Sequence, residues 1–204
     1  AQLQNGDFYV FYSLDKDGKP SVPRAAILME GDSIAQVRGV GADQNLDRFI
    51  APVVEEKMKE FPDGKKYQKK SEDMKTLTAI DINVKAGKEL TKEDLRFLYE
   101  IDHEIEGFGY ERDPRIEELL YGRDLKEDLS FVLGISKEKI STTKDEALKG
   151  GIEYHHGSLK LYGLTSAEGL NLPTNIGGGL YLSSLTSVEG LTLPQSIGGG
   201  LYLS

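Results

Sequence analysis

LKLYGLTSAEGLNLPTNIGGG occupies residues 159–179, and LYLSSLTSVEGLTLPQSIGGG follows it directly at residues 180–200. The two segments have the same length and are identical at 14 of 21 positions, and a third copy begins with LYLS at residues 201–204. Self-similarity at a fixed period of this length is typical of solenoids, in which each repeat stacks on its neighbour. The sequence therefore predicts a repeat array in this part of the chain.

Each period contains two Leu-x-Leu steps, whose alternation of apolar side chains is typical of β-strands. In the first copy the steps occupy residues 159–161 and 170–172, and Pro173 is expected to end the second step, since proline donates no hydrogen bond to a ladder. The glycine triplet at 177–179 is expected to form the tight return of the chain, because glycine adopts positive φ angles at little cost. One repeat supplies about six aliphatic side chains to a narrow core, which only neighbouring repeats about 4.8 Å away can cover.

The composition of the chain changes near residue 150. Residues 151–204 hold one basic and three acidic residues, whereas residues 1–150 hold the other 24 basic and 31 acidic ones. Eleven of the 23 glycines also follow residue 150. We therefore predict an α+β domain over 1–150 and a repeat domain over 151–204, with the boundary at Gly150–Gly151.

The repeats resemble those of known bacterial proteins. The order Ile-x-x-x-Leu-x-Leu-x-x-Leu-Thr-Ser, followed by Leu-x-Leu-Pro, is similar to bacterial leucine-rich repeats and to the LTSxEGLxLPxxIGG repeats of uncharacterised bacterial proteins. The resemblance covers residues 159–204 and implies a short leucine-rich-repeat-like array. Gly163 and Ser184 stand where leucine-rich repeats usually carry Asn after the strand. A β-solenoid with two short strands per repeat is therefore an alternative to a horseshoe.

The segment before the repeats, 1–150, combines strand and helix signals. Segments 8–13, 25–29 and 33–38 are separated by turn residues, so we expect an antiparallel β-meander over about residues 8–38. Helices are expected over about residues 52–149. Their start signals are Pro52 and the capping residues Thr91, Asp113, Asp124 and Thr143. A long helix is expected over about residues 65–82.

Two expectations concern these helices in particular. The last helices before residue 150 are expected to cover the first repeat, because the open end of a solenoid would expose its core. The capping box at Thr91 is expected to open a helix that carries Leu95, Leu98, Ile101 and Ile105 on one side.

A second resemblance concerns residues 25–45, AAILMEGDSIAQVRGVGADQN. This segment is similar to a strand-turn-strand segment of PcfJ-like proteins of mobile elements, in which a Gln-x-Arg-Gly step is matched here by Gln36, Arg38 and Gly39. The resemblance implies an association with mobile elements or uncultivated bacteria.

Composition and charge exclude several classes of protein. The absence of Cys excludes disulfides, thiolate catalysis and Cys-type zinc sites. The 34 acidic residues outnumber the 25 basic ones and give a net charge of −9, which argues against a nucleic-acid partner. No apolar run reaches the roughly 18 residues of a membrane span, and the first residues show no signal pattern, so we expect no membrane partner and a cytoplasmic protein.

The titratable residues indicate structural roles. His103 lies between two acids on an expected helix, which is typical of an exposed helix face. His155 and His156 are adjacent, so in a strand they point to opposite faces and do not share a metal ion. The lysines of residues 65–70 are flanked by acids and indicate a solvated helix face. We therefore expect no metal site and no cofactor.

Gln36 and Arg38 form the basis of one enzyme-like alternative. Alternation along the third strand places both on the face that carries Ile34. If helices cover that face, a buried Arg38 requires an acidic partner. The alternative pocket therefore consists of Gln36, Arg38 and an acid.

Repeats stacked one period apart align their outward side chains in columns. The middle residue of the first Leu-x-Leu step points outward, so Lys160, Tyr181 and Tyr202 form one column. Exposed aromatic residues on a regular face are typical of binding surfaces, although Tyr is also a common strand residue, which leaves a structural role open. The other two columns are Asn171 with Thr192 and Glu168 with Glu189.

These observations predict a protein–protein interaction module that uses the repeat face. The alternative is an enzyme or toxin module in residues 1–150 that the repeats target to a partner. The incomplete third repeat predicts a fragment of a longer protein. The open final strand at 201–203 predicts a homodimer through that edge.

Overall fold

The computed structural model has a mixed α/β fold and describes residues 7–31, 33–41, 45–108 and 111–203. The chain divides into two compact units. The first unit comprises Ala1–Lys75 and Glu106–Phe108, and the second comprises Thr76–Ile105 and Gly109–Ser204. The predicted division at residue 150 stays a prediction.

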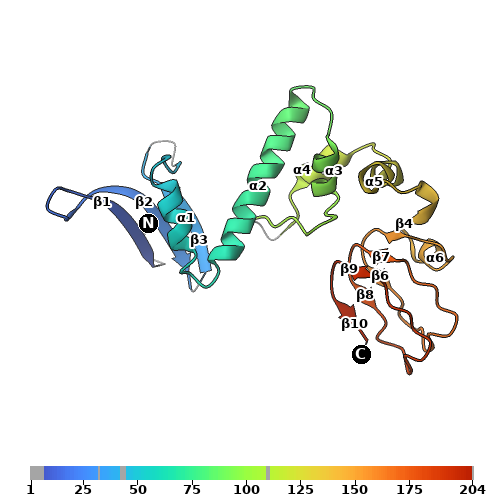
Figure 1. Ribbon diagram of the computed structural model, residues 1–204. Helices are drawn as coiled ribbons and strands as arrows, with labels where there is room; N and C mark the ends of the chain where they lie inside the picture. The colour runs from blue at the N-terminus through green and yellow to red at the C-terminus, as the bar shows by residue number, and fades with distance from the viewer. Residues whose placement is uncertain (1–6, 32, 42–44, 109–110, 204) are drawn as a thin grey trace. The chain divides into compact units, whose positions relative to one another are not determined.

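An antiparallel three-stranded sheet lies in the first unit (Figure 1). Strands β1 (Phe8–Leu14), β2 (Pro20–Glu30) and β3 (Ser33–Gly39) are arranged in the order β1-β2-β3. This arrangement confirms the predicted meander. Alternate residues of β2 are buried, as expected for a strand with one covered face. These residues are Ala25, Ile27 and Met29.

A bulge in β3 changes the face on which two predicted site residues lie. The register with β2 shifts beside Gln36, which makes Ala35 an extra residue and breaks the alternation. Ile34 is buried in the core of the first unit, and Val37 packs against the same core. Gln36 and Arg38 flank Val37 and therefore point to the opposite face. The prediction that they share a face with Ile34 is wrong.

Helices α1 (Ala51–Met58) and α2 (Gly64–Lys85) follow the sheet in sequence. Pro52 lies in the first turn of α1, where a missing N–H has no intrahelical partner to lose. Val54 and Met58 lie one turn apart and are buried in the same cluster as the inward residues of β2, and Tyr67 of α2 packs against this cluster. The helices thus cover the inner face of the sheet.

The second unit contains short helices, and four of them begin directly after the capping residues that were predicted from the sequence. Thr91, Asp113, Asp124 and Thr143 each accept a hydrogen bond from a backbone N–H in the first turn of the next helix. Each cap of this kind stabilises a helix by about 1 kcal/mol. The elements are α3 (Lys92–Leu98), α4 (Pro114–Leu120), α5 (Leu125–Leu133), the 3-10 turn η2 (Lys137–Lys139) and α6 (Lys144–Ala147).

Helix α3 is shorter than predicted. It ends at Leu98, and Glu100 adopts a positive φ of 54°. Because a left-handed residue does not continue a right-handed helix, Ile101 and Ile105 lie beyond α3. The Glu100 carboxylate accepts a hydrogen bond of 2.8 Å from the Ile105 N–H, which organises the segment after the helix. His103 consequently lies in a bend and not on a helix face.

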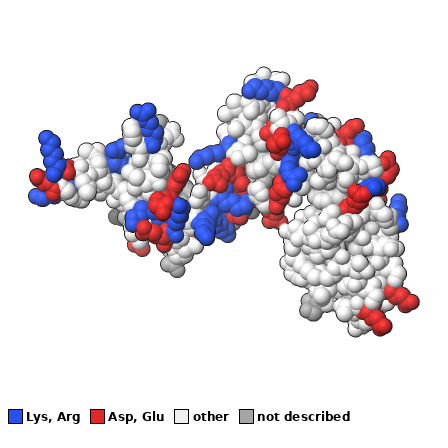
Figure 2. Space-filling view, in the orientation of Figure 1, with Lys and Arg blue, Asp and Glu red and all other residues white. Residues whose placement is uncertain are grey.

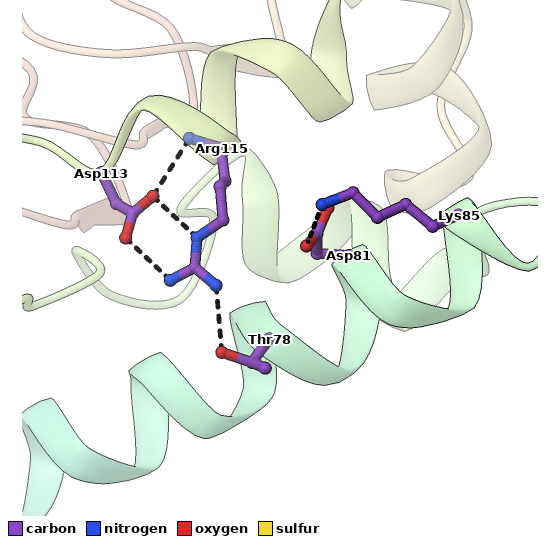
Figure 3. A network of polar contacts seen from close by, with 5 residues as sticks. All are labelled: Thr78, Asp81, Lys85, Asp113 and Arg115. Carbon is purple, nitrogen blue, oxygen red and sulfur yellow. Dashed lines mark hydrogen bonds and ion pairs between the residues drawn. The ribbon is translucent and has the colours of Figure 1, made fainter.

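A polar network joins α4 to the part of α2 that lies in the second unit (Figure 3). The Arg115 guanidinium donates to both carboxylate oxygens of Asp113, at 2.9 and 2.8 Å, and its remaining terminal nitrogen donates to the Thr78 hydroxyl at 3.0 Å. Further along α2, Asp81 pairs with Lys85 at 2.8 Å. The Arg115 guanidinium lowers the pKa of Asp113 and holds the start of α4 against α2.

Two parallel ladders of two-residue strands run through the repeated segments (Figure 1). In both ladders the strands of successive repeats pair one period apart, as Leu159 does with Leu180 and Leu180 with Leu201. The first ladder contains β6 (Leu159–Lys160), β8 (Leu180–Tyr181) and β10 (Leu201–Tyr202). The second contains β4 (Ile140–Ser141), β5 (Tyr154–His155), β7 (Asn175–Ile176) and β9 (Ser196–Ile197).

The second strand of each repeat lies after the predicted Leu-x-Leu step. Leu170 and Leu172 pack against the hydrophobic cluster of the repeats but belong to no strand. The ladder begins only after Pro173, which lacks an N–H to donate. The next two N–H groups, of Thr174 and Asn175, each donate to a carbonyl of the preceding segment at 3.0 Å. The predicted position of this strand is therefore wrong by a few residues.

The glycine triplets allow close backbone packing, and the predicted positive φ angles are absent. None of the glycines at 177–179 and 198–200 has a positive φ, whereas Gly169, in open space, has a φ of 70°. A methyl group on Gly178 would lie 2.6 Å from the carbonyl carbon of Gly157. The missing Cβ is therefore what lets successive segments approach each other here.

Leucine and isoleucine side chains fill the interior of the repeats. Leu180 is fully buried, whereas Leu201, its equivalent in the third copy, is 39% exposed. Ala147 of α6 is buried in the same cluster, which agrees with the expectation that the last helix covers the first repeat. The other fully buried members are Leu159, Leu161, Ile176 and Leu182.

Candidate functional site

A column of outward side chains stands on the first ladder of the repeats. Lys160 of β6 lies opposite Tyr181 of β8, and Tyr202 of β10 lies opposite Tyr181 on its other side. The register thus brings together the three residues that the period predicts as one column. The rings of Tyr181 and Tyr202 are stacked, with 4.4 Å between centroids and 8° between planes.

Tyr162 adds a third ring to this column. Its ring centroid lies 6.1 Å from that of Tyr181, at an interplanar angle of 59°. The Lys160 Nζ lies 5.7 Å from the Tyr181 centroid, within the range of a cation–π attraction. Tyr162 is 58% exposed and Tyr202 46% exposed. We call Lys160, Tyr162, Tyr181 and Tyr202 the tyrosine ladder.

Periodicity alone does not predict the membership of Tyr162. Ser183 occupies the equivalent position in the second copy, so no aromatic column passes through Tyr162 in the sequence. Its ring joins the ladder from the turn after β6 and meets Tyr181 from the side. A pattern that searches for repeated residues therefore misses it.

Glycines make room for the rings of the tyrosine ladder. A methyl group on Gly179 would lie 3.0 Å from Cε2 of Tyr181, and one on Gly200 would lie 2.7 Å from the Tyr202 hydroxyl. Each ring therefore leans back over the glycine two residues before it. Tyr181 and Tyr202 turn one ring face toward each other, whereas the Tyr162 ring is tilted relative to that of Tyr181.

Charged side chains are sparse on the repeats. In Figure 2 the part of the molecule that holds the repeats is mainly white, whereas blue and red atoms gather over the helices. Lys160 is the one basic residue in the sequence from 151 to 204. A tyrosine-rich surface with few charges has the composition of the central part of protein interfaces.

The other two predicted columns lie on exposed turns. The backbone N–H groups of Glu168 and Glu189 donate to the serine hydroxyl two residues earlier, at 3.2 and 3.1 Å. The Asn171 side-chain amide donates to the backbone carbonyl two residues earlier, at 3.3 Å. Thr192 is likewise exposed. These residues therefore take part in local turns, and none of the four makes one of the ring contacts described for the tyrosine ladder.

A cavity of about 410 Å³ lies in the first unit, and Gln36 and Arg38 are not part of its lining. The bulge in β3 turns these two side chains to the outer face of the sheet, whereas the cavity opens on the inner one. The alternative pocket of Gln36, Arg38 and an acid stays a prediction. The lining of the cavity includes Val37, Leu46, Val54, Met58, Tyr67 and Gln68.

A buried serine–histidine pair links β4 to β5. Ser141 and His155 lie opposite each other in the ladder, and Ser141 Oγ is 2.9 Å from His155 Nδ1. Sequence reasoning does not reveal this pair, because the two residues are distant in the chain and belong to no motif. The contact resembles a nucleophile and its base, but both side chains are buried, so a substrate has no access to the hydroxyl. The pair is therefore a structural link between strands.

His156 occupies a half-buried site next to this pair. Its ring packs edge-on against Tyr99 at 6.0 Å, and its Nδ1 is buried without a hydrogen-bond partner among the described residues. Burial lowers the pKa of both His155 and His156 from the ordinary value of 6.5. The Arg112 guanidinium lowers the pKa of His156 further, as does a proton on His155. Both histidines are thus held neutral at neutral pH.

We expect the second unit to lose stability as the pH falls below about 6.5. The unfolded chain protonates both histidines near their ordinary pKa, whereas the folded chain resists protonation. The stabilising effect is therefore complete above that pH and is lost progressively as the pH drops toward the lower pKa of the folded state. Urea unfolding between neutral pH and about pH 5 measures this loss of stability. In that range the histidines dominate, because carboxylates with a lowered pKa reduce the free energy of unfolding only at still lower pH.

The variant His156→Gln should make the urea midpoint less dependent on pH in this range. The control Thr192→Gln, at an exposed position of the same unit that carries no titratable group, should leave the pH dependence unchanged. A midpoint of the unaltered chain that is the same throughout this range would contradict the expectation.

Comparisons with known proteins identify no relative, so the candidate site is chosen from the geometry of the structure alone. No family model matches the chain, and neither a curated protein nor a solved structure matches it. Within the described part of the chain, no helix combines the length and apolar composition that crossing a membrane requires. The same residues contain no group of three or more His, Asp or Glu side chains placed to hold a metal ion. The tyrosine ladder is the site that the geometry favours.

Proposed function

We propose that this chain is a protein–protein interaction module whose repeats contact the partner through the tyrosine ladder. The observation that carries the proposal is the stack of Tyr181 on Tyr202, extended by Tyr162 and Lys160, on a surface with few charges. Tyrosine offers apolar area together with a hydroxyl, and it is enriched among the residues that dominate binding energy.

Preorganisation supports the same function. A side chain that becomes ordered only on binding costs about 0.5–1.5 kcal/mol in lost rotamer freedom. Tyr181 and Tyr202 are already ordered by their stack and by the glycines beneath the rings. The tyrosine ladder therefore offers aromatic contact area whose side chains are already ordered in the free protein, so binding loses little further rotamer freedom.

The proposal includes a leucine-rich-repeat-like β-solenoid for residues 151–204. Support comes from the pairing of strands one repeat period apart in two parallel ladders and from the shared cluster of leucine and isoleucine side chains. Two strands per period favour a β-solenoid over a horseshoe, in which each leucine-rich repeat contributes one strand.

Binding with ladder variants tests the proposed function. The chain is immobilised, proteins from a lysate of the source cells are captured, and a captured protein is purified for affinity measurements. The double variant Tyr181→Ala/Tyr202→Ala should weaken binding about thirtyfold, because truncation of hot-spot residues costs about 2 kcal/mol. Circular dichroism and the melting temperature show whether the variant remains folded.

Tyr121→Ala is the matched control for this experiment. Tyr121 lies in the second unit outside the ladder and is 90% exposed, so the same substitution there removes an aromatic ring without touching the proposed surface. It should leave the affinity unchanged. Equal affinity for the unaltered chain, the double variant and the control would show that the ladder is not the contact surface.

A further inference from the structure

Strand β1 forms one edge of the sheet in the first unit. It pairs with β2 on one side, and no described residue pairs with it on the other. Its sequence, FYVFYSL, contains no charged residue, no Pro and no Gly. Tyr9, Val10, Tyr12 and Leu14 are all exposed. Exposed edges of this kind are templates for pairing with another strand.

The register shows which backbone groups of β1 face outward. The Met29 N–H donates to the Asp7 carbonyl at 2.9 Å, so Asp7 directs its carbonyl toward β2. Hydrogen-bonded and non-hydrogen-bonded pairs alternate along an antiparallel ladder. Tyr9 and Phe11 therefore also bond to β2, whereas Phe8 and Val10 direct their N–H and C=O groups to the open edge.

The opposite edge of the same sheet is protected. The outward N–H of Ile34 in β3 donates to the Asp63 carboxylate at 2.8 Å, and that of Val37 donates to the Tyr67 hydroxyl at 3.0 Å. The extra residue Ala35 also makes β3 irregular. Capped donors and bulges are two of the ways in which proteins prevent edge pairing.

Strand β1 carries neither form of protection. In its pairing with β2 the extra residues at both register shifts, Arg24 and Ser21, lie in β2, so β1 itself keeps a regular alternation. Among the described residues, Val10 makes no backbone hydrogen bond other than those that belong to the pairing of β1 with β2. The two edges of one sheet thus differ, and the difference leaves β1 able to pair.

Self-complementarity of an uncharged strand points to a second copy of this chain as the occupant. The chain has a net charge of −9, and most of its surface therefore repels another copy. Strand β1 is uncharged, and an antiparallel pair of identical strands about a two-fold axis needs only self-complementarity. With Val10 on the axis, Asp7, which precedes β1, faces Ser13 of the second copy, and Asp15, which follows β1, lies beyond the paired residues 7–13, so no like charges are opposed within the pairing.

We propose that two copies of this chain associate by antiparallel pairing of their β1 strands, with Val10 opposite Val10, to form one continuous six-stranded sheet. The outward N–H and C=O groups of Val10 then bond to those of the second copy. The interaction is separate from the tyrosine ladder, which lies in the second unit.

The mass of the full chain as a function of concentration tests the proposal. Sedimentation equilibrium should show a monomer at low concentration and a doubled mass at high concentration. Val10→Lys should raise the dissociation constant at least about tenfold, because it places two like charges directly opposite each other. Val22→Lys is the matched control, since Val22 is similarly exposed in the interior strand β2, and it should leave the dissociation constant unchanged.

Amide hydrogen exchange provides a second readout that is specific to the predicted register. The Val10 amide should exchange rapidly in the monomer and at least about tenfold more slowly in the dimer. The amides of Tyr9 and Phe11, which bond to β2, should be protected at both concentrations and in both variants, which also shows that the sheet remains folded.

Two results would overturn the proposal. One is a monomer at every concentration tested, with rapid exchange at Val10 throughout. The other is a dimer whose dissociation constant is the same for the unaltered chain and for Val10→Lys, which would place the contact on another surface such as the edge of β10.

Discussion

Replacing Gly178 by alanine is expected to lower the free energy of unfolding of the second unit by about 3 kcal/mol or more. The added methyl group would lie 2.6 Å from the Gly157 carbonyl carbon and 2.6 Å from the Ser158 nitrogen. Both are backbone atoms, so relief requires the two segments to separate. Separation stretches the hydrogen bond between the Gly178 N–H and the Gly157 carbonyl, which is 2.8 Å long.

Gly169→Ala is the control that separates packing from backbone conformation. Gly169 has a φ of 70° and open space around its Cα, so alanine there costs only the left-handed conformation, about 1 kcal/mol. Exchange of the Leu159 and Leu180 amides, which bond across the first ladder, reports the stability of the repeats directly. Equal losses in the two variants would mean that close packing at Gly178 contributes nothing.

Replacing Leu180 by alanine is expected to cost about 2–5 kcal/mol of the same free energy. Leu180 is fully buried and belongs to the cluster that fills the repeats. Removing its side chain leaves a cavity between aliphatic neighbours from the repeats on either side, and this narrow core has little freedom to close it.

Leu201→Ala tests the same residue type at the equivalent position of the next repeat. Leu201 is 39% exposed, so truncation there should cost less than about 1 kcal/mol. Urea unfolding of the two variants, followed by circular dichroism, gives the difference. Comparable losses would indicate that Leu201 is covered in solution by something other than the described residues.

Local chemistry predicted where elements begin. Thr91 and Asp113 bond to N–H groups within three residues, so the signal and its partner are adjacent in the sequence. The end of α3 depends on a more distant contact. Ile101 and Ile105 continue the apolar period, but Glu100 adopts a left-handed conformation in which its carboxylate bonds to the Ile105 N–H. Spacing of apolar residues carries no information about such a contact.

The candidate site was predictable only where it repeats. The repeat period predicts that Lys160, Tyr181 and Tyr202 lie in one register, and the pairing of β6, β8 and β10 has that register. Tyr162 occurs in one copy, so its ring contact was not predictable from the period. The hydrogen bond between Ser141 and His155 was not predictable either, because it joins two strands, β4 and β5, that precede the repeated segments and share no sequence motif.

The sequence by itself determined the antiparallel sheet, the starts of the capped helices and the pairing offset of the repeats. These features depend on residue periodicity and on contacts over a few positions. The tertiary structure decided three others: the bulge at Ala35, the close packing at Gly178 and the different burial of Leu180 and Leu201. Equivalent positions of two repeats can carry the same residue and still differ in structure. The burial of a side chain and the space around a glycine depend on which segment of the chain packs against it, and only the folded structure determines that segment.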